Sequence, residues 1–267
     1  MIDLLEFGVI RNMVTLRAVY PSGTKFKKIW QPIVKLLDTL PIKIDQNGLA
    51  IRQMSSDNNL MIVFELTSTS FEEYYVEGGE ALVEIPSSEV ANAIKRATRE
   101  DIVELNYDSS SPYFVIRYIN KKTSVEREFK ILASELSIGE ELREPDVELE
   151  ASFSMKPKDF RDIVADAKVV GDEVYLSAVE ETNEIKVHAS EVNKSYDAIL
   201  TIGNPLLSLN IDTDAHAKYS ISHLNDASRA YQAAEMAKIS FGKDKPMKVE
   251  YELEFNSLLR IWIAPYL

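Results

Sequence analysis

The feature that most constrains this chain is an internal duplication with a constant spacing of 134 residues. Three separate stretches match at that spacing, and no slippage is needed between them. Chance alignment of two unrelated α+β domains is the alternative, and three matches at one spacing argue against it. The matched positions are Phe26 with Phe160, Val90 with Leu224, and Pro112 with Pro246. The duplication predicts an extension at 1–12, one unit at 13–133, a connector at 134–146, and a second unit at 147–267.

The connector, residues 134–146, is acidic, contains a glycine and a proline, and has no sustained helix or strand period. Three apolar residues, Leu136, Ile138 and Leu142, interrupt its charge. A linker that only had to stay solvated would have little use for them. We therefore expect the connector to lie against a surface.

Composition limits the class of protein. The 267 residues are 45% hydrophobic and 27% charged, which suits a globular protein of two domains. Cysteine is absent, which excludes a disulfide framework, cysteine-ligated zinc and thiol catalysis. No apolar run is long enough to span a bilayer, and the N-terminus lacks the basic region of a signal peptide, so we expect a cytoplasmic location. The net charge of −13 would repel nucleic acid unless the basic residues gather on one surface.

Hydrophobic periodicity predicts an α+β fold in which each unit has two helices among eight or nine antiparallel strands. Helices are expected over residues 23–40, 87–97, 158–169 and 224–234, with a kink or a fresh turn at Pro32. In the first unit strands are expected over 13–20, 42–45, 49–54, 60–66, 80–86, 101–107, 113–119 and 125–132. In the second they are expected over 148–155, 173–179, 184–189, 196–202, 206–211, 237–241, 247–253 and 259–264.

No motif for catalysis or cofactor binding is present: there is no phosphate-binding loop, nucleophile elbow, zinc-protease helix or dinucleotide fingerprint. The three histidines are scattered along the chain. The stretch 212–216 contains the possible metal ligands Asp212, Asp214 and His216, but it lacks the glycine and the closing glutamate of a calcium loop. We expect a solvated turn there, no metal, no cofactor and no enzymatic activity.

Several stretches resemble the PCNA sliding clamps, and most closely those of archaea. The most specific is the terminal Trp262-Ile263-Ala264-Pro265, and residues 47–54 and 168–178 also look like the family's turns. The resemblance covers residues 13–267. It implies a DNA clamp fold and a ring of three chains that encloses duplex DNA and tethers other proteins to it.

The resemblance assigns roles to residues on three surfaces. The helices would turn basic side chains toward DNA phosphates without base readout: Lys25, Lys28, Lys35, Lys95, Arg96, Arg99, Arg161, Lys168 and Arg229. A pocket for partner peptides would be formed by Met54, Asn58, Met61, Leu136, Ile138, Leu142, Pro246, Trp262, Ala264 and Pro265. Subunits would join by adding strand 125–132 of one chain to strand 184–189 of the next, through Val125, Arg127, Phe129, Ile185 and Val187.

The implied partners are duplex DNA, DNA polymerase, flap nuclease, ligase and the clamp loader, with no membrane partner and a cytoplasmic, nucleoid-associated location. A scaffold that binds peptides without encircling DNA is the alternative, and the basic helix faces argue against it. An enzyme of unfamiliar design is a third possibility, which the missing motifs disfavour. The sequence leaves open whether three identical chains or paralogous chains close the ring.

Overall fold

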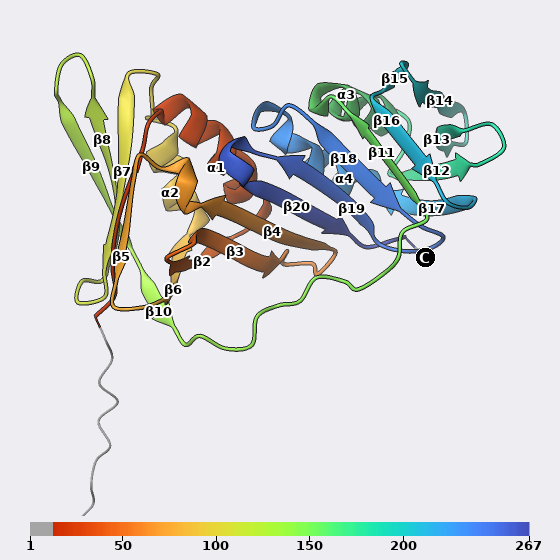
Figure 1. The fold of residues 1–267 in the computed structure, drawn as a ribbon. Helices are drawn as coiled ribbons and strands as arrows, with labels where there is room; N and C mark the ends of the chain where they lie inside the picture. Colours follow the sequence, from red (N-terminus) through yellow and green to blue (C-terminus); the bar gives the residue numbers. More distant parts are fainter. Residues whose placement is uncertain (1–12, 267) are drawn as a thin grey trace, which may run out of the picture.

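The computed structural model describes residues 13–266, so the expected extension at 1–12 lies outside the described residues. Figure 1 shows two strand-rich halves side by side, joined by one long sheet and by the connector that runs along the lower edge of the picture. This arrangement confirms the predicted α+β class with antiparallel sheets.

The first half contains two α-helices, nine strands and one short 3₁₀-helix among the described residues. In chain order they are β1 (Thr15–Tyr20), α1 (Gly23–Leu36), β2 (Thr39–Asp45), β3 (Gly48–Met54), β4 (Leu60–Thr67), η1 (Ser68–Ser70), β5 (Glu73–Glu77), β6 (Ala81–Pro86), α2 (Ser87–Ile94), β7 (Asp101–Asp108), β8 (Tyr113–Asn120) and β9 (Glu126–Leu132). Strand β10 (Ser134–Leu136) begins the connector.

The second half repeats this order. Its elements are β11 (Ala151–Met155), α3 (Pro157–Lys168), β12 (Glu173–Val179), β13 (Glu184–Glu191), β14 (Lys194–Ile202), β15 (Pro205–Leu206), β16 (Ser208–Ile211), β17 (Ala215–Ser220), α4 (Ile221–Ala227), η2 (Ser228–Gln232), β18 (Ala237–Phe241), β19 (Met247–Glu252), η3 (Glu254–Asn256) and β20 (Leu258–Ile263).

The sheets carry the duplication into three dimensions. The order β5-β1-β7-β8-β9 in one half matches β16-β11-β18-β19-β20 in the other, and β6-β2-β3-β4 matches β17-β12-β13-β14. Strands that correspond in sequence position therefore occupy corresponding places in the sheets. The division at 133 and 147 stays a prediction from sequence, because a continuous sheet joins the two units.

The junction between the halves is the pairing of β4 with β20 in a ten-stranded sheet, β10-β6-β2-β3-β4-β20-β19-β18-β11-β16. At its centre Ile62 lies opposite Ile261, and both side chains are buried. The sheet is therefore continuous across the boundary between the two sequence units.

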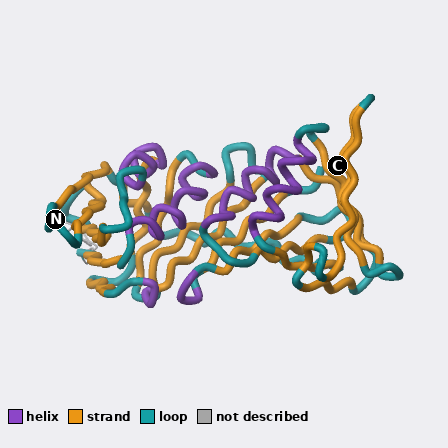
Figure 2. Tube along the Cα trace, turned by 90° about the horizontal axis from the view of Figure 1, so that it is seen from above, coloured by secondary structure: helices purple, strands orange, loops and turns teal. Residues whose placement is uncertain are grey.

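All four helices pack on one face of this sheet. Helix α1 contacts α2, α4 and η2, and α3 contacts α4 and η2, so the helices form one layer, seen as a group over the strands in Figure 2. The ring of Trp30 on α1 meets Phe64 of β4 at 5.3 Å between centroids. Alternate residues of β4, such as Met61 and Val63, point to the opposite face. The helix layer and the connector thus lie on opposite faces.

Helix α1 is shorter than predicted. It begins as expected, with the Ser22 hydroxyl accepting a hydrogen bond from the Lys25 amide, but it ends at Leu36 instead of residue 40. Thr39 already pairs with Pro86 in the sheet, so long-range strand pairing overrides the helical period there. The expectation at Pro32 was a kink or a fresh turn; one helix continues through Pro32, so no fresh turn begins there.

Four other predictions differ from the structure. Strand β5 was missed, because it is an edge strand with largely exposed residues. The start of the connector is strand β10, paired with β6, although its composition predicted irregular chain. Helix α4 begins at Ile221, three residues early, and continues as the 3₁₀-helix η2. The single strand expected over 206–211 is two short strands, β15 and β16.

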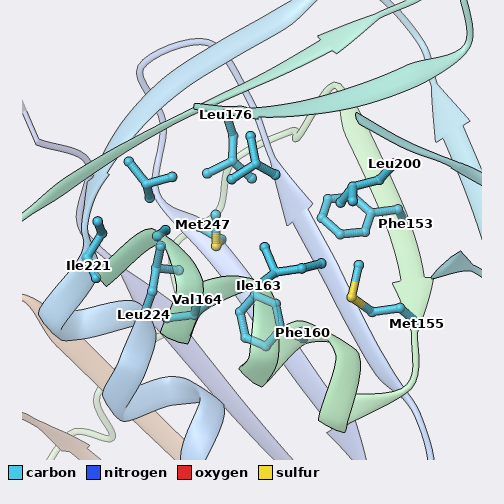
Figure 3. Close-up of a pocket in the computed structure, with 13 residues that line it drawn as sticks. Phe153, Met155, Phe160, Ile163, Val164, Leu176, Leu200, Ile221, Leu224 and Met247 are labelled. Carbon is cyan, nitrogen blue, oxygen red and sulfur yellow. The ribbon is translucent and has the colours of Figure 1, made fainter. Parts of the chain in front are cut away.

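The core of the second half holds a small apolar cavity of about 20 Å³ (Figure 3). Phe160 and Val164 of α3, Ile221 and Leu224 of α4, and Met247 of β19 point toward it. Its lining is entirely apolar, and cavities of that kind stay dry. We take it as a packing gap, not a ligand site.

Candidate nucleic-acid and partner interfaces

The helix layer carries a polar groove of about 340 Å³ that is lined by residues of α1, α3, α4 and η2. Lys28 and Lys35 of α1, Arg161 of α3 and Arg229 of η2 line it. The Arg161 guanidinium lies 4.3 Å from the centroid of the Tyr231 ring, a cation–π contact that orients it. Tyr231 was not predicted, since nothing in the sequence pairs it with Arg161. Four of the nine predicted DNA-facing residues therefore share one surface.

Ion pairs compensate some of these charges and not others. Lys25 Nζ lies 2.6 Å from a Glu254 carboxylate oxygen, and Arg229 lies 2.8 Å from Asp226. Within residues 13–266, the remaining predicted cations apart from Arg161 form no ion pair: Lys28, Lys35, Lys95, Arg96, Arg99 and Lys168. All six are exposed. The uncompensated positive charge therefore comes mainly from α1, from the end of α2 and from the end of α3.

The opposite face of the central sheet carries a small hydrophobic cluster. Met61 and Val63 of β4 pack with Trp262 of β20, and Met54 and Leu149 complete the cluster, which we call the Trp262 cluster. Met61 and Trp262 were predicted to line an open peptide pocket, yet their exposed fractions are only 5% and 6%. These two side chains are therefore not open to a peptide in this structure, because Leu149, just past the connector, and Met54 pack on them.

The predicted connector residues line a different groove. Leu136, Ile138 and Leu142 face a groove of about 280 Å³ whose other side is formed by β2, β3 and β6, including Pro41, Ala50 and Leu82. Trp262 and Met61 are not among its lining residues. The structure thus divides the predicted pocket into an open groove under the first half of the connector and a covered cluster under the second half.

The other predicted pocket residues lie near the ends of β4, β19 and β20. Asn58 is exposed in the turn before β4 with a left-handed backbone, and Pro246 directly precedes β19. The Ala264 amide donates to the Asn59 carbonyl at 2.9 Å, which fixes the chain ahead of Pro265 against that turn. These residues are close to the covered cluster because Met61 pairs with Trp262.

Glu144 closes the covered cluster, a role that was not predicted because it is one of several connector acids. Its carboxylate accepts a hydrogen bond from Trp262 Nε1 at 2.8 Å and two from Arg260, at 2.9 Å from Nε and 2.6 Å from Nη2. Burial favours a higher pKa for Glu144, but the hydrogen bonds from Trp262 and Arg260 outweigh it, and the pKa is lowered. We call these three residues the Glu144 latch.

The predicted subunit interface requires a correction. Strand β13, with Ile185 and Val187, pairs with β12 on one side and β14 on the other, and both side chains are buried. It has no open edge to which a strand could be added. The open edge of that sheet is β14 over residues 194–200, since β15 covers only its end. Strand β9 does lie at a sheet edge, as predicted, and carries Arg127 and Phe129.

The stretch 212–216 forms a bend and the start of β17. Asp214 accepts a hydrogen bond from the Glu180 amide, and His216 stacks on Tyr175. Among residues 13–266, no three His, Cys, Asp or Glu side chains are grouped so that they could hold a metal ion. No described helix is long and apolar enough to cross a membrane.

A duplicated domain, one sheet shared between both copies, helices on one face and a connector on the other define a two-domain clamp. A structure of PCNA from Thermococcus kodakaraensis has this fold: it superposes with a TM-score of 0.85 at 20% identity, covering 94% of this chain and all of that one. Residues 15–140 match the family model of the proliferating cell nuclear antigen N-terminal domain.

Named relatives extend the match over almost the whole chain. DNA polymerase sliding clamp 1 of Saccharolobus solfataricus is 29% identical over 255 residues, which is 94% of this chain and 99% of that protein. DNA polymerase sliding clamp 2 of Sulfurisphaera tokodaii is 26% identical over 94% of this chain and all of its own length. Together with the fold, these matches make the chain similar over almost its whole length to the PCNA-type sliding clamps of archaea.

Proposed function

We propose that this protein is a DNA sliding clamp, a non-enzymatic processivity factor that encircles duplex DNA and tethers replication and repair proteins to it. One observation carries the proposal: a chain of net charge −13 gathers uncompensated cations on its helix layer. Phosphate contacts by Lys and Arg give binding that does not depend on sequence, which suits a protein that slides. Acidic residues elsewhere would keep DNA away from the outer surfaces.

The duplication supports ring closure. Within the chain, β4 of the first half pairs with β20 of the second. By the 134-residue spacing, β14 is the counterpart of β4 and β9 the counterpart of β20. Strand β9 lies at a sheet edge, and β14 has an open edge over residues 194–200. Joining β9 of one chain to β14 of the next therefore repeats the junction that already exists inside the chain. Repetition of one junction is how closed rings form.

The internal junction also predicts the register between chains. Shifted by the same spacing, it places Arg127 opposite Tyr196 and Glu126 opposite Asp197. The burial pattern supports this register. Arg127 and Tyr196 are both half-buried, and Glu126 and Asp197 are both exposed, so residues on the same face of each strand lie opposite one another. The register is the same whether the next chain is identical or a paralogue that shares the fold.

A retention assay tests encirclement. The protein, loaded with its clamp loader, should stay on nicked circular DNA in moderate salt and should leave the same DNA once it is linearised. Changing Lys28, Lys35 and Arg161 together to Glu should lower loading and polymerase stimulation, with peptide binding unchanged. Equal retention on circular and linear DNA would favour the peptide-binding scaffold that does not encircle DNA.

Tethering is assigned to the connector face, on the side of the sheet away from the helices. The groove at Leu136, Ile138 and Leu142 and the neighbouring Trp262 cluster offer apolar surface to a short peptide, the mode in which an amphipathic turn enters a hydrophobic groove. Polymerase, flap nuclease, ligase and clamp loader are the expected partners, in the cytoplasm near the nucleoid. Trp262→Ala with Pro265→Ala should abolish binding of a polymerase-tail peptide while the assembly persists.

A further inference from the structure

The contacts of the Trp262 cluster indicate which chemical group a peptide bound there must carry. This inference rests on the proposed tethering function. Trp262, Met61 and Val63 are buried. Leu149, just past the connector, packs on them, and Glu144 of the connector accepts the hydrogen bond from Trp262 Nε1. The Glu144 latch fixes the connector to β20. A peptide that reaches Trp262 must therefore lift the chain around residues 144–149.

Lifting the connector has a specific polar consequence. Among residues 13–266, the only hydrogen-bond acceptor of Trp262 Nε1 is Glu144. An indole N–H that loses its acceptor while its surroundings stay apolar is strongly unfavourable. Arg260 keeps one partner, Glu65 at 3.2 Å, but loses both of its hydrogen bonds to Glu144. An incoming ligand must supply an acceptor at this position.

The surrounding charges select the kind of acceptor. With Glu144 displaced, three cations remain on this face near Trp262: Arg52, Arg260 and Lys248, whose Nζ lies 5.4 Å from the Trp262 ring. Two carboxylates oppose them, Glu65 bonded to both arginines and Glu250 bonded to Lys248. The face is then left with more positive than negative charge. A planar guanidinium beside an N–H donor suits a carboxylate better than a neutral carbonyl.

We propose that the Trp262 cluster receives a peptide that carries an Asp or Glu side chain beside its apolar anchor, and that Glu144 occupies the carboxylate position when no partner is bound. The partner carboxylate takes over the hydrogen bonds from Trp262 Nε1 and Arg260. Its apolar anchor takes the place of Leu149 on Met61 and Val63. Glu144 thus competes with the partner and contributes to selecting acidic peptides over neutral ones.

The first experiment tests the cover. In a Trp30→Phe background, Trp262 is the single tryptophan and reports its own exposure. Glu144→Ala should increase acrylamide quenching of Trp262 fluorescence, because the connector loses its hydrogen bonds. Glu148→Ala removes an exposed acid just past the connector and should leave quenching unchanged. Equal quenching in all three proteins would overturn the latch.

The second experiment tests the ligand. The probes are synthetic peptides with two aromatic residues and one aliphatic residue at helical spacing. They are made in pairs: one member has Glu and the other has Gln at the same position, and that position is moved along the peptide from pair to pair. At one position the Glu peptide should bind about tenfold tighter than its Gln partner, since a charge-assisted hydrogen bond is worth about 1.4 kcal/mol or more. Glu144→Ala should bind that Glu peptide more tightly than the parent protein does, and Arg260→Met should remove the preference.

The outcomes separate the acidic-peptide proposal from the proposed function. If no peptide binds any variant, tethering at this face fails. If Glu and Gln peptides bind equally at every position, and Glu144→Ala changes neither affinity, the carboxylate proposal is overturned while tethering stands. Glu144→Gln keeps the side-chain shape without the charge, so it gives the same test where Glu144→Ala does not fold.

Discussion

Ile62 of β4 lies directly opposite Ile261 of β20, and both have an exposed fraction of 0%. The pair belongs to the main core, shared by both halves and by the helix layer. Because this is the strand pairing that joins the halves, its packing decides whether the two units behave as one body. The packing of Ile62 with Ile261 therefore stabilises the fold and also fixes the position of one half relative to the other.

The first prediction follows from this pair. Ile261→Ala should lower the free energy of unfolding by about 2–5 kcal/mol, the usual cost of deleting buried methyl groups. Leu258→Ala, at the half-buried end of the same strand, should cost less. Urea unfolding followed by circular dichroism measures both. If Ile261→Ala costs no more than Leu258→Ala, the junction does not hold the halves together.

The second prediction concerns the register between chains, in which Glu126 faces Asp197. Like charges directly opposite on paired strands cost roughly 0.2–1 kcal/mol. Glu126→Lys should therefore strengthen self-association by up to about fivefold per interface, measured by sedimentation of the chain alone. Glu181→Lys makes the same charge change in an exposed turn and is the control. Weakened association in Glu126→Lys would contradict the register.

The local features of this fold could be predicted from the sequence. Pro157 marks the start of α3, and the helical spacing of Phe160 and Val164 gives its buried face. The constant spacing of the duplication also predicted the correspondence of strands that the sheets confirm. These features are encoded within short windows or by direct repetition.

Features that depend on long-range pairing could not be predicted. Ile185 and Val187 alternate with polar residues as an edge strand would, but edge status depends on which strands pair, and β14 occupies that edge. Glu144 is one acid among several in the connector, and only the fold brings it to Trp262. Basic side chains on the helices were predicted by charge and resemblance together, whereas the polar groove and the stacking of Arg161 on Tyr231 were not.

The third prediction separates two neighbouring lysines on α1. Lys25 is paired with Glu254, whereas Lys28 has no ion pair among the described residues and lines the polar groove of the helix layer. Lys28→Ala should reduce the magnitude of the salt slope of DNA binding by about 0.9 for each phosphate that is no longer neutralised. Lys25→Ala should change it less, because the cation is already compensated. Fluorescence anisotropy at a series of salt concentrations measures both slopes. A larger change in slope for Lys25→Ala than for Lys28→Ala would contradict the assignment of Lys28 to the DNA surface.

The fourth prediction concerns the cavity in the second half (Figure 3). Val164→Ile adds one methyl group beside a gap of about 20 Å³ and should be neutral or raise the free energy of unfolding by up to about 1 kcal/mol. Val83→Ile makes the same change in the first half at a position with an exposed fraction of 0%, and overpacking there should cost about 1–3 kcal/mol. Thermal unfolding compares them, and equal losses would mean that the gap cannot accept a methyl group.

The last prediction is a pH dependence of the connector. Hydrogen bonds from Trp262 and Arg260 hold the pKa of Glu144 below its ordinary value of 4.5, against the opposing effect of burial. A carboxylate with a lowered pKa stabilises the folded arrangement fully above its unfolded-state pKa, and this contribution is lost as the pH falls through the lowered value. The latch should therefore be closed at neutral pH and should open in acid. Glu65, Arg52 and Arg260 are the charged groups that face it.

Trp262 fluorescence in the Trp30→Phe background measures the opening. Emission should shift to longer wavelength with a midpoint below pH 4.5, as the indole N–H loses its acceptor and meets water. Glu144→Gln has no carboxylate to titrate, so its emission should not change over this range. Far-ultraviolet circular dichroism recorded in parallel must stay constant, so that the shift reports the connector and not global unfolding. A transition of the same midpoint in Glu144→Gln would assign it to another acid and remove Glu144 as the group that holds the connector.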